Sequence, residues 1–186
     1  MKKIILLICL LFLAGCSNIE TSGEEVDELE IFVSSYNKAA KTLEENSNLL
    51  INQLNPSNFQ EIERTKDGYG FKRILDNSIS DETTTMFTLE VFYDNDKNII
   101  GYQVYSVGNL KKIINDGTTE YSTPGIASSY AIADVLFDDV KQFSDHFLNI
   151  MNSEEEEFYY EENGYKVSMT FKADIGAIAI KFMKTE

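Results

Sequence analysis

Two segments of the chain carry apolar residues at the spacing of an amphipathic helix. In the first, residues 27 to about 45, apolar side chains recur every three or four positions, at Leu29, Phe32, Val33, Tyr36, Ala39, Ala40 and Leu43. In the second, from about 125 to 152, the main apolar stripe consists of Ile126, Tyr130, Ala133, Phe137, Val140, Phe147 and Met151. Thr123 and Pro124 are favoured residues at a helix start. The spacing predicts two helices that each bury one face, and residues 49–54 are expected to add a further turn or two after the first.

Alternating apolar and polar residues predict strands in the rest of the chain. The clearest case is 85–93, where Phe87, Leu89 and Val91 share one face. The other predicted strands span residues 59–66, 69–75, 99–107, 157–161, 165–171 and 177–184. Two Gly-containing pairs predict tight hairpin turns, because such turns need positive φ angles; they are Asp67-Gly68 and Asn163-Gly164. Residues 109–122 are polar and are expected to be turn-like, with 110–114 in a state that the pattern does not decide.

The order of these elements predicts an α+β fold. We expect two amphipathic helices packed on an antiparallel sheet of about six or seven strands. The layout is similar to that of cystatin-like and nuclear-transport-factor-like folds, by analogy of layout only, since no motif of either family is present. The two halves, 26–108 and 123–186, share a local pattern: Lys66-Asp67-Gly68-Tyr69 in the first and Glu162-Asn163-Gly164-Tyr165 in the second. A diverged helix-plus-meander repeat is one interpretation, and the recurrence of common turn residues is the other.

The first fifteen residues have the three parts of a secretory signal. Lys2 and Lys3 form a positive start, an apolar run extends from Ile4 to Leu13, and Ala14-Gly15 supplies small residues after it. The apolar run is too short to span a bilayer as a mature helix. We therefore expect export, with residues 1–15 as signal peptide. Residues 16–25 would form a lipidated cysteine and flexible tether, and residues 26–186 a single domain.

The end of this signal also resembles the lipobox of bacterial lipoprotein precursors, through Leu13-Ala14-Gly15-Cys16. In that family the cysteine thiol receives a diacylglyceryl group, and a peptidase cleaves just before the cysteine. The resemblance implies lipidation of Cys16 and cleavage between Gly15 and Cys16. Two or more acyl chains give a stable membrane anchor. The protein would then lie at the outer face of the cytoplasmic membrane in a Gram-positive host, which residue usage favours, or at the outer membrane in a Gram-negative one. The alternative is an ordinary secretory signal with an incidental cysteine.

Composition limits the partners and the chemistry. The net charge of −15 becomes −17 once the two lysines of the signal are removed. Such a surface repels nucleic acids, so no nucleic-acid partner is expected. Cys9 leaves with the signal and Cys16 carries lipid, which leaves the domain without a free thiol or a disulfide. Stability then depends on the core, for which twelve Phe and ten Tyr supply apolar material.

Few residues are candidates for catalysis or metal binding. The single histidine, His146, falls on the polar face of the second predicted helix beside Asp145, which favours a solvated surface residue. The segment 94–98 begins like a calcium loop, but Ile99 stands where that loop needs Gly, and Tyr105 where it needs Glu. A hairpin loop is the preferred interpretation, and weak calcium binding stays open. Without a second histidine or a thiol, no metal and no cofactor are expected.

An acidic stretch follows the second predicted helix. Glu154–Glu157, Glu161 and Glu162 surround Phe158, Tyr159 and Tyr160. One hypothesis is a docking surface for a basic peptide, or for a sugar stacked on the aromatic rings. The favoured one is a solvated helix exit followed by an edge strand whose charges prevent aggregation.

The sequence thus predicts a non-enzymatic binding or accessory lipoprotein of the cell envelope, acting through an unidentified protein or peptide partner. One alternative is a small-molecule or carbohydrate-binding lipoprotein, with a tyrosine-lined pocket between sheet and helices. Another is a wall hydrolase that uses paired carboxylates, which 31 acidic residues neither support nor exclude.

Overall fold

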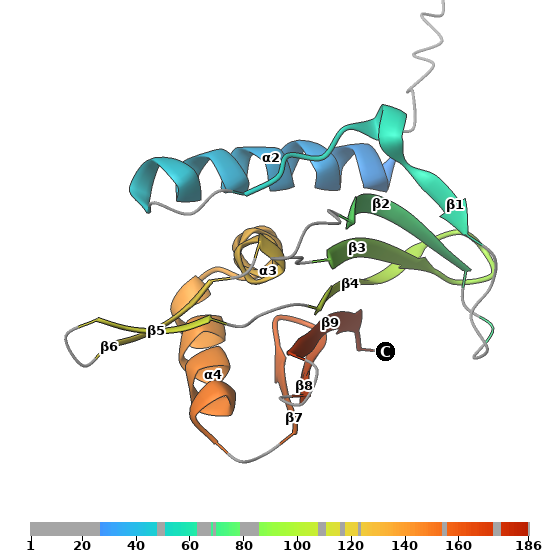
Figure 1. Ribbon diagram of the computed structural model, residues 1–186. Coiled ribbons are helices and arrows are strands. Elements are labelled where there is room, and N and C mark those ends of the chain that lie inside the picture. Colours follow the sequence, from blue (N-terminus) through green and yellow to red (C-terminus); the bar gives the residue numbers. More distant parts are fainter. Residues whose placement is uncertain are drawn as a thin grey trace, which may run out of the picture.

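The structure is a computed structural model of the whole chain (Figure 1). It describes residues 27–47, 51–62, 68, 70–78, 86–107, 111–115, 118–122, 124–153, 156–172 and 176–185. The predicted signal, lipobox and tether lie outside the described residues, as does Asp67. Within the described ranges, no helix combines the length and the apolarity that a membrane span requires.

Seven strands form one antiparallel sheet, in the order β1-β2-β3-β4-β9-β8-β7. They are β1 (Gln60–Ile62), β2 (Gly70–Ser78), β3 (Met86–Tyr93), β4 (Ile99–Val107), β7 (Glu157–Glu162), β8 (Tyr165–Lys172) and β9 (Ala177–Lys184). In the described part of the chain, three α-helices lie in a layer beside it (Figure 1): α2 (Glu28–Asn46), α3 (Pro124–Leu136) and α4 (Val140–Asn152). The predicted α+β fold is confirmed.

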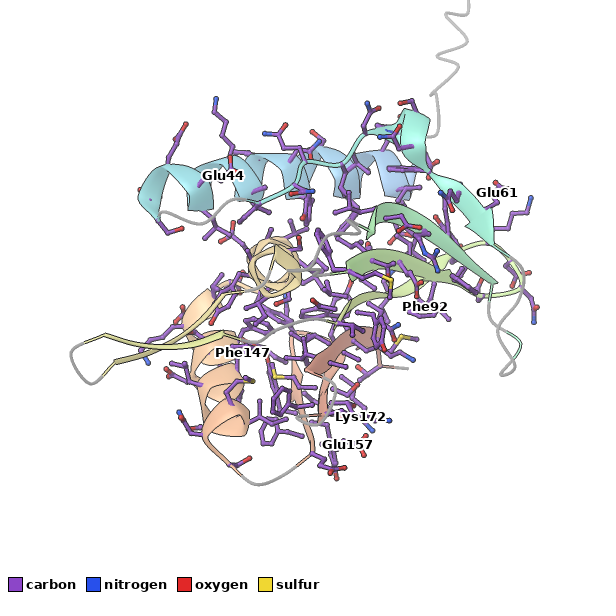
Figure 2. The ribbon with its side chains drawn as sticks, viewed as in Figure 1. Glu44, Glu61, Phe92, Phe147, Glu157 and Lys172 are labelled. Atoms are coloured by element: carbon purple, nitrogen blue, oxygen red, sulfur yellow. The ribbon has the colours of Figure 1, made fainter. Side chains whose placement is uncertain are left out.

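The register of the sheet aligns apolar side chains of adjacent strands on one face, which we call the core face. Leu89, Val104, Ile180 and Met169 lie opposite one another on four adjacent strands, and each is at most 1% exposed. This confirms the alternation predicted for 85–93. The described helices pack on this face, and Figure 2 shows side chains filling the space between the two layers. We call the opposite side of the sheet the open face.

Helix α2 begins at an N-cap and lies against the centre of the sheet. The Asp27 carboxylate accepts a hydrogen bond from the Leu29 backbone N–H at 3.0 Å, as expected for a cap. On the buried side of the helix, the ring of Phe32 stacks on that of Tyr102 in β4, with centroids 4.0 Å apart. The apolar stripe predicted for this helix is the surface that it buries.

Residues 51–55 run back along α2 (Figure 1). The Asn37 side chain holds this segment through both polar groups of Leu54, accepting from its N–H at 2.7 Å and donating to its carbonyl at 3.0 Å. Residues 51–55 therefore belong to neither a helix nor a strand, and the helical turns predicted for 49–54 are wrong over 51–54. Side-chain bonds from α2 satisfy the backbone groups that a helix would have paired internally.

The second predicted helix, 125–152, is two helices. Between α3 and α4 the chain opens at Asp139, whose backbone is extended, with φ −140° and ψ 107°. The carboxylate of Asp139 accepts from the N–H of Lys141 at 2.8 Å and so caps α4. The prediction of one helix was wrong because the Asp139 side chain bonds the backbone at the start of a new helix, which competes with the backbone hydrogen bonds of a continuous one.

Residues 109–122, predicted to be turn-like, contain a second, two-stranded sheet. Strand β5 (Lys111–Asn115) pairs with β6 (Thr118–Ser122) in antiparallel register. Backbone pairing does not require an alternating apolar pattern, which is why the polar composition concealed these strands.

The two halves of the chain join through the centre of the large sheet, where β4 pairs with β9. The turn at Asn163-Gly164 has the predicted positive φ angles, 48° and 77°. Gly68, also with positive φ, lies between β1 and β2, whereas Gly164 lies between β7 and β8. If a rotation related the two halves by exchanging β4 with β9, it would also match β2 with β7. The turn that follows β7 would then correspond to the turn that follows β2, whereas Gly68 lies before β2, so these two turns would not correspond. The repeat therefore stays a prediction, and the similar Gly-containing turns of the two halves do not support it.

Candidate functional site

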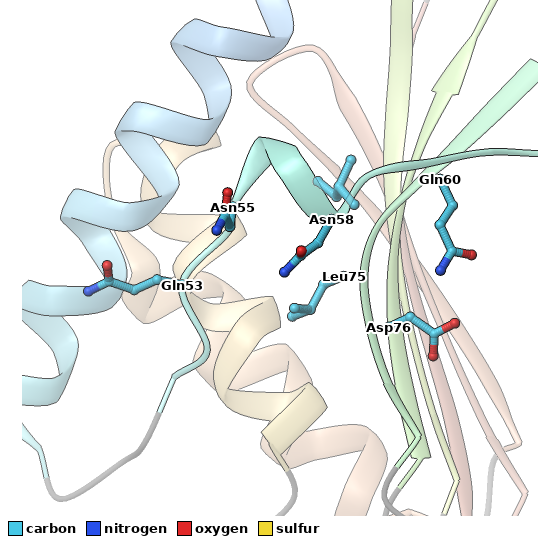
Figure 3. A pocket seen from close by; sticks show the side chains of 7 residues that line it. Gln53, Asn55, Asn58, Gln60, Leu75 and Asp76 are labelled. Atoms are coloured by element: carbon cyan, nitrogen blue, oxygen red, sulfur yellow. The ribbon is translucent and has the colours of Figure 1, made fainter.

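A polar recess lies where β1 leaves the edge of β2. Strand β1 pairs only with residues 71–73 of β2, because the preceding chain turns away as the short 3₁₀-helix η1 (Pro56–Asn58). The space that it leaves has a volume of about 340 Å³. We call it the edge recess, lined by Gln53, Asn55, Asn58, Gln60, Ile74, Leu75 and Asp76 (Figure 3).

Hydrogen bonds inside η1 orient the Asn55 amide in this recess. The Asn55 side-chain oxygen accepts from the Ser57 N–H at 3.1 Å and from the Ser57 hydroxyl at 2.9 Å. The Asn58 side-chain oxygen lies 3.3 Å from the same hydroxyl, whose single hydrogen is directed to the nearer Asn55 oxygen. The NH₂ group of Asn55 lies outside these bonds, so Asn55 lines the recess as an oriented donor.

A second recess lies beside the first, on the open face of the sheet. It has a volume of about 310 Å³. We call it the face recess, lined by Arg73, Asp76, Met86, Thr88, Glu90, Gln103 and Tyr105. Asp76 lines both spaces, so the edge recess and the face recess adjoin at this residue.

The charges in the face recess are paired with one another. Arg73 binds Asp76 through Nη1 at 3.1 Å and Glu90 through Nη2 at 3.3 Å. The Gln103 amide donates to the second oxygen of Glu90 at 3.3 Å. The Glu90 side chain is only 12% exposed, so its negative charge needs these partners. The network holds the side chains around the recess in place.

His146 lies in a different environment from the one predicted. It is half-buried, and its ring stacks on that of Tyr160 in β7, with centroids 4.1 Å apart. The prediction of a solvated residue was wrong because β7 covers this part of the polar face of α4. Nearby, the buried atoms Glu162 Oε2 and Tyr160 Oη have no hydrogen-bond partner among the described residues. Burial raises the pKa of the Glu162 carboxyl, and the charge of His146 opposes this shift.

The predicted acidic stretch includes an edge strand. Strand β7 is the last strand of the sheet, and Tyr159 on it is 65% exposed. The ammonium of Lys166, on β8, lies 4.6 Å from the centroid of the Tyr159 ring. Glu154 and Glu155 lie outside the described residues. The edge position agrees with the favoured interpretation of charges that oppose aggregation.

The segment 94–98 is the hairpin loop between β3 and β4, as preferred from the sequence. One oxygen of Asp94 accepts from the N–H groups of Asp96 at 2.9 Å and of Asn98 at 2.8 Å. The other accepts from the Asn98 side-chain amide at 2.9 Å. These bonds hold the pKa of the Asp94 carboxyl below its ordinary value. Both oxygens of the first candidate calcium ligand are thus used by the loop itself.

Two of the tyrosines between sheet and helices belong to the core. Tyr36 and Tyr102 are 0% and 3% exposed, and the Tyr36 hydroxyl donates to the Asn52 carbonyl at 3.2 Å. Burial raises the pKa of Tyr36 to about 12. These rings fill the layer in which a tyrosine-lined pocket was expected, while the two recesses lie at the sheet edge and on the open face.

Sequence reasoning missed the edge recess, although a signal for it is present. Residues 52–60 contain five side-chain amides, at Asn52, Gln53, Asn55, Asn58 and Gln60, and four of them line the recess. The sequence analysis used Asn55-Pro56 only as a helix end. No protein-family model, no curated protein and no solved structure matches the chain. The candidate site therefore depends on its own geometry.

Proposed function

We propose that the protein is an exported, lipid-anchored binding protein of the cell envelope without enzymatic activity. It is held at the outer face of the membrane by acyl chains on Cys16. The observation that carries the proposal is Leu13-Ala14-Gly15-Cys16, placed directly after an apolar run of signal-peptide length. The two adjoining recesses support a binding role, since an anchored domain with a preformed polar site presents that site outside the cell.

The charge pairing in the face recess supports a binding role over hydrolysis. Hydrolysis of a glycoside by two carboxyl groups requires one of them to donate a proton. Asp76 and Glu90 are both held by ion pairs with Arg73, so their carboxylates serve the network around the recess. A protein or peptide partner of positive charge fits the acidic surface, and a carbohydrate ligand fits the amides of the edge recess.

The anchor is tested on the protein made in its native host. We expect mass spectrometry of the N-terminal peptide to find residue 16 acylated and residues 1–15 removed. Metabolic labelling with an alkyne fatty acid should mark the wild-type protein and not Cys16→Ala, because the thiol is the attachment point. Ser17→Ala is the matched control and should label normally. An unmodified Cys16 in the wild-type protein would refute the anchor.

A further inference from the structure

We infer that the edge recess and the face recess together bind a neutral carbohydrate chain. The inference rests on the proposed binding function and names the ligand class for it. It depends on four features of the site: the kind of polar groups, their rigidity, the charge around them and the length of the combined space.

The polar groups match those of a sugar. Sugar hydroxyls both donate and accept hydrogen bonds, and a side-chain amide offers one group of each kind. The oxygen of Asn55 already accepts from Ser57, so its NH₂ group is available to donate, and the amide of Asn58 beside it offers both a donor and an acceptor. Asp76 uses one oxygen for Arg73, and its other oxygen lies outside that bond. The recess thus presents both donors and an acceptor to the hydroxyls of a bound sugar.

The site is held in shape before any ligand binds. Asn37 fixes the chain beside the recess through both polar groups of Leu54. Asn55 caps η1, and Ile74, another lining residue, is 0% exposed. A site that does not have to order itself loses less entropy on binding.

The charge around the site selects against anionic ligands. Asp76 is the one charged residue among the described residues that line the edge recess, and it is ion-paired. No Lys or Arg lines the edge recess, Arg73 in the face recess is already paired with Asp76 and Glu90, and the whole chain carries −15, so a phosphate or a uronate would meet no unpaired cation among these lining residues. An apolar ligand would leave the amides without partners, which costs free energy. A cationic ligand would have to displace Arg73 from Asp76 and Glu90. The lining therefore favours a neutral, hydroxyl-rich ligand.

The combined length suits more than one sugar unit. Each recess alone, at about 340 and 310 Å³, lies at the small end of the range for ligand sites, roughly 300–1,000 Å³. A chain that passes Asp76 would continue from the edge recess onto the open face. There the ring of Tyr105 offers a surface for sugar C–H groups, beside the amide of Gln103.

Binding is tested by isothermal titration of the full chain, purified in mild detergent. The probes are neutral hexasaccharides of β-1,4-glucose, α-1,4-glucose and β-1,4-N-acetylglucosamine, with hexagalacturonate as the anionic counterpart and hexalysine as a basic peptide. We expect at least one neutral hexasaccharide to bind, and hexagalacturonate to bind about tenfold more weakly or not at all.

Two variants locate the site. Asn58→Asp keeps the size of the side chain but replaces the donor NH₂ with a charged oxygen, and Gln60→Ala removes one amide. Each should weaken binding by about three- to tenfold, as for the loss of one or two hydrogen bonds. Gln142→Ala, an exposed amide on α4, is the matched control and should bind like the wild type. Circular dichroism confirms that each variant is folded.

The inference is overturned if no neutral hexasaccharide binds, if the Asn58→Asp and Gln60→Ala variants bind as the wild type does, or if only hexalysine binds. None of these results affects the anchor, which is measured separately at Cys16. Shortening of a bound hexasaccharide would refute the proposed lack of enzymatic activity and would leave the site itself supported.

Discussion

At the scale of single residues, Glu162 is a charged residue whose side chain is partly buried. It lies at the end of β7, and one of its carboxylate oxygens is buried without a hydrogen-bond partner among the described residues. Burial is the main cause of its raised pKa; His146 lowers the value, and Asp138 and Asp139 raise it. The ionised form is therefore disfavoured by folding.

This environment makes the stability of the protein depend on pH. Since the pKa of Glu162 is higher in the folded chain, its favourable contribution is complete below the unfolded value of 4.5 and is lost as pH rises through the folded value. We expect Glu162→Gln to raise the melting temperature at pH 7 and to have little effect at pH 4. Thermal unfolding followed by circular dichroism at both pH values measures this.

The matched control is Glu161→Gln on the same strand, where the side chain is exposed. It should change the melting temperature little at either pH. A Glu162→Gln variant that is less stable than the wild type at pH 7 would show that the carboxylate has a favourable partner there.

At the scale of elements, the break between α3 and α4 is held by two side-chain contacts. Asp139 caps α4 through the N–H of Lys141, and the Asn163 amide donates to the Leu136 carbonyl at the end of α3, at 2.7 Å. The β7–β8 turn thus binds the corner between the helices. The apolar stripe continues through the break because Phe137 and Phe143 are both buried in the same core, so periodicity alone could not reveal it.

Removing the cap should destabilise the protein. We expect Asp139→Ala to lower the free energy of unfolding by about 0.5–2 kcal/mol, the usual contribution of an N-cap. Urea denaturation measures the change. Asp138→Ala, next to it and exposed, is the control and should change the free energy by less than about 0.5 kcal/mol. Equal effects of the two substitutions would argue that the cap contributes nothing.

At the scale of the whole molecule, one core joins the two halves of the chain. Phe32 and Tyr102 from the first half, and Phe143 and Phe182 from the second, belong to the same buried cluster. The strand pair β4–β9 connects the halves through Val104 and Ile180 among others. Each half supplies only part of the large sheet, and without the other half β4 or β9 would lose a neighbouring strand.

Such a core should unfold in one step. We expect calorimetry of the full chain to show a single transition whose calorimetric and van't Hoff enthalpies agree. Ile180→Ala, at the strand pair between the halves, should lower the free energy of unfolding by roughly 2–5 kcal/mol and keep the single transition. Two separate transitions in the wild type would show that the halves fold independently.

Local spacing along the chain was sufficient to determine the helix over α2, the alternation in β3, the Asn163-Gly164 turn and the α+β class. Each of these depends on residues a few positions apart, which share a face or a turn by backbone geometry alone. The predicted export and lipid anchor likewise depend on sixteen consecutive residues.

Only the tertiary structure decided the strand order, the partner of His146 and the recesses. Gln53 and Asp76 line one recess because β1 begins only at Gln60 and leaves the next residues of β2 uncovered. His146 meets Tyr160 because β7 returns beneath α4. Contacts between distant residues follow from how whole elements pack, and a short stretch of sequence does not specify that packing.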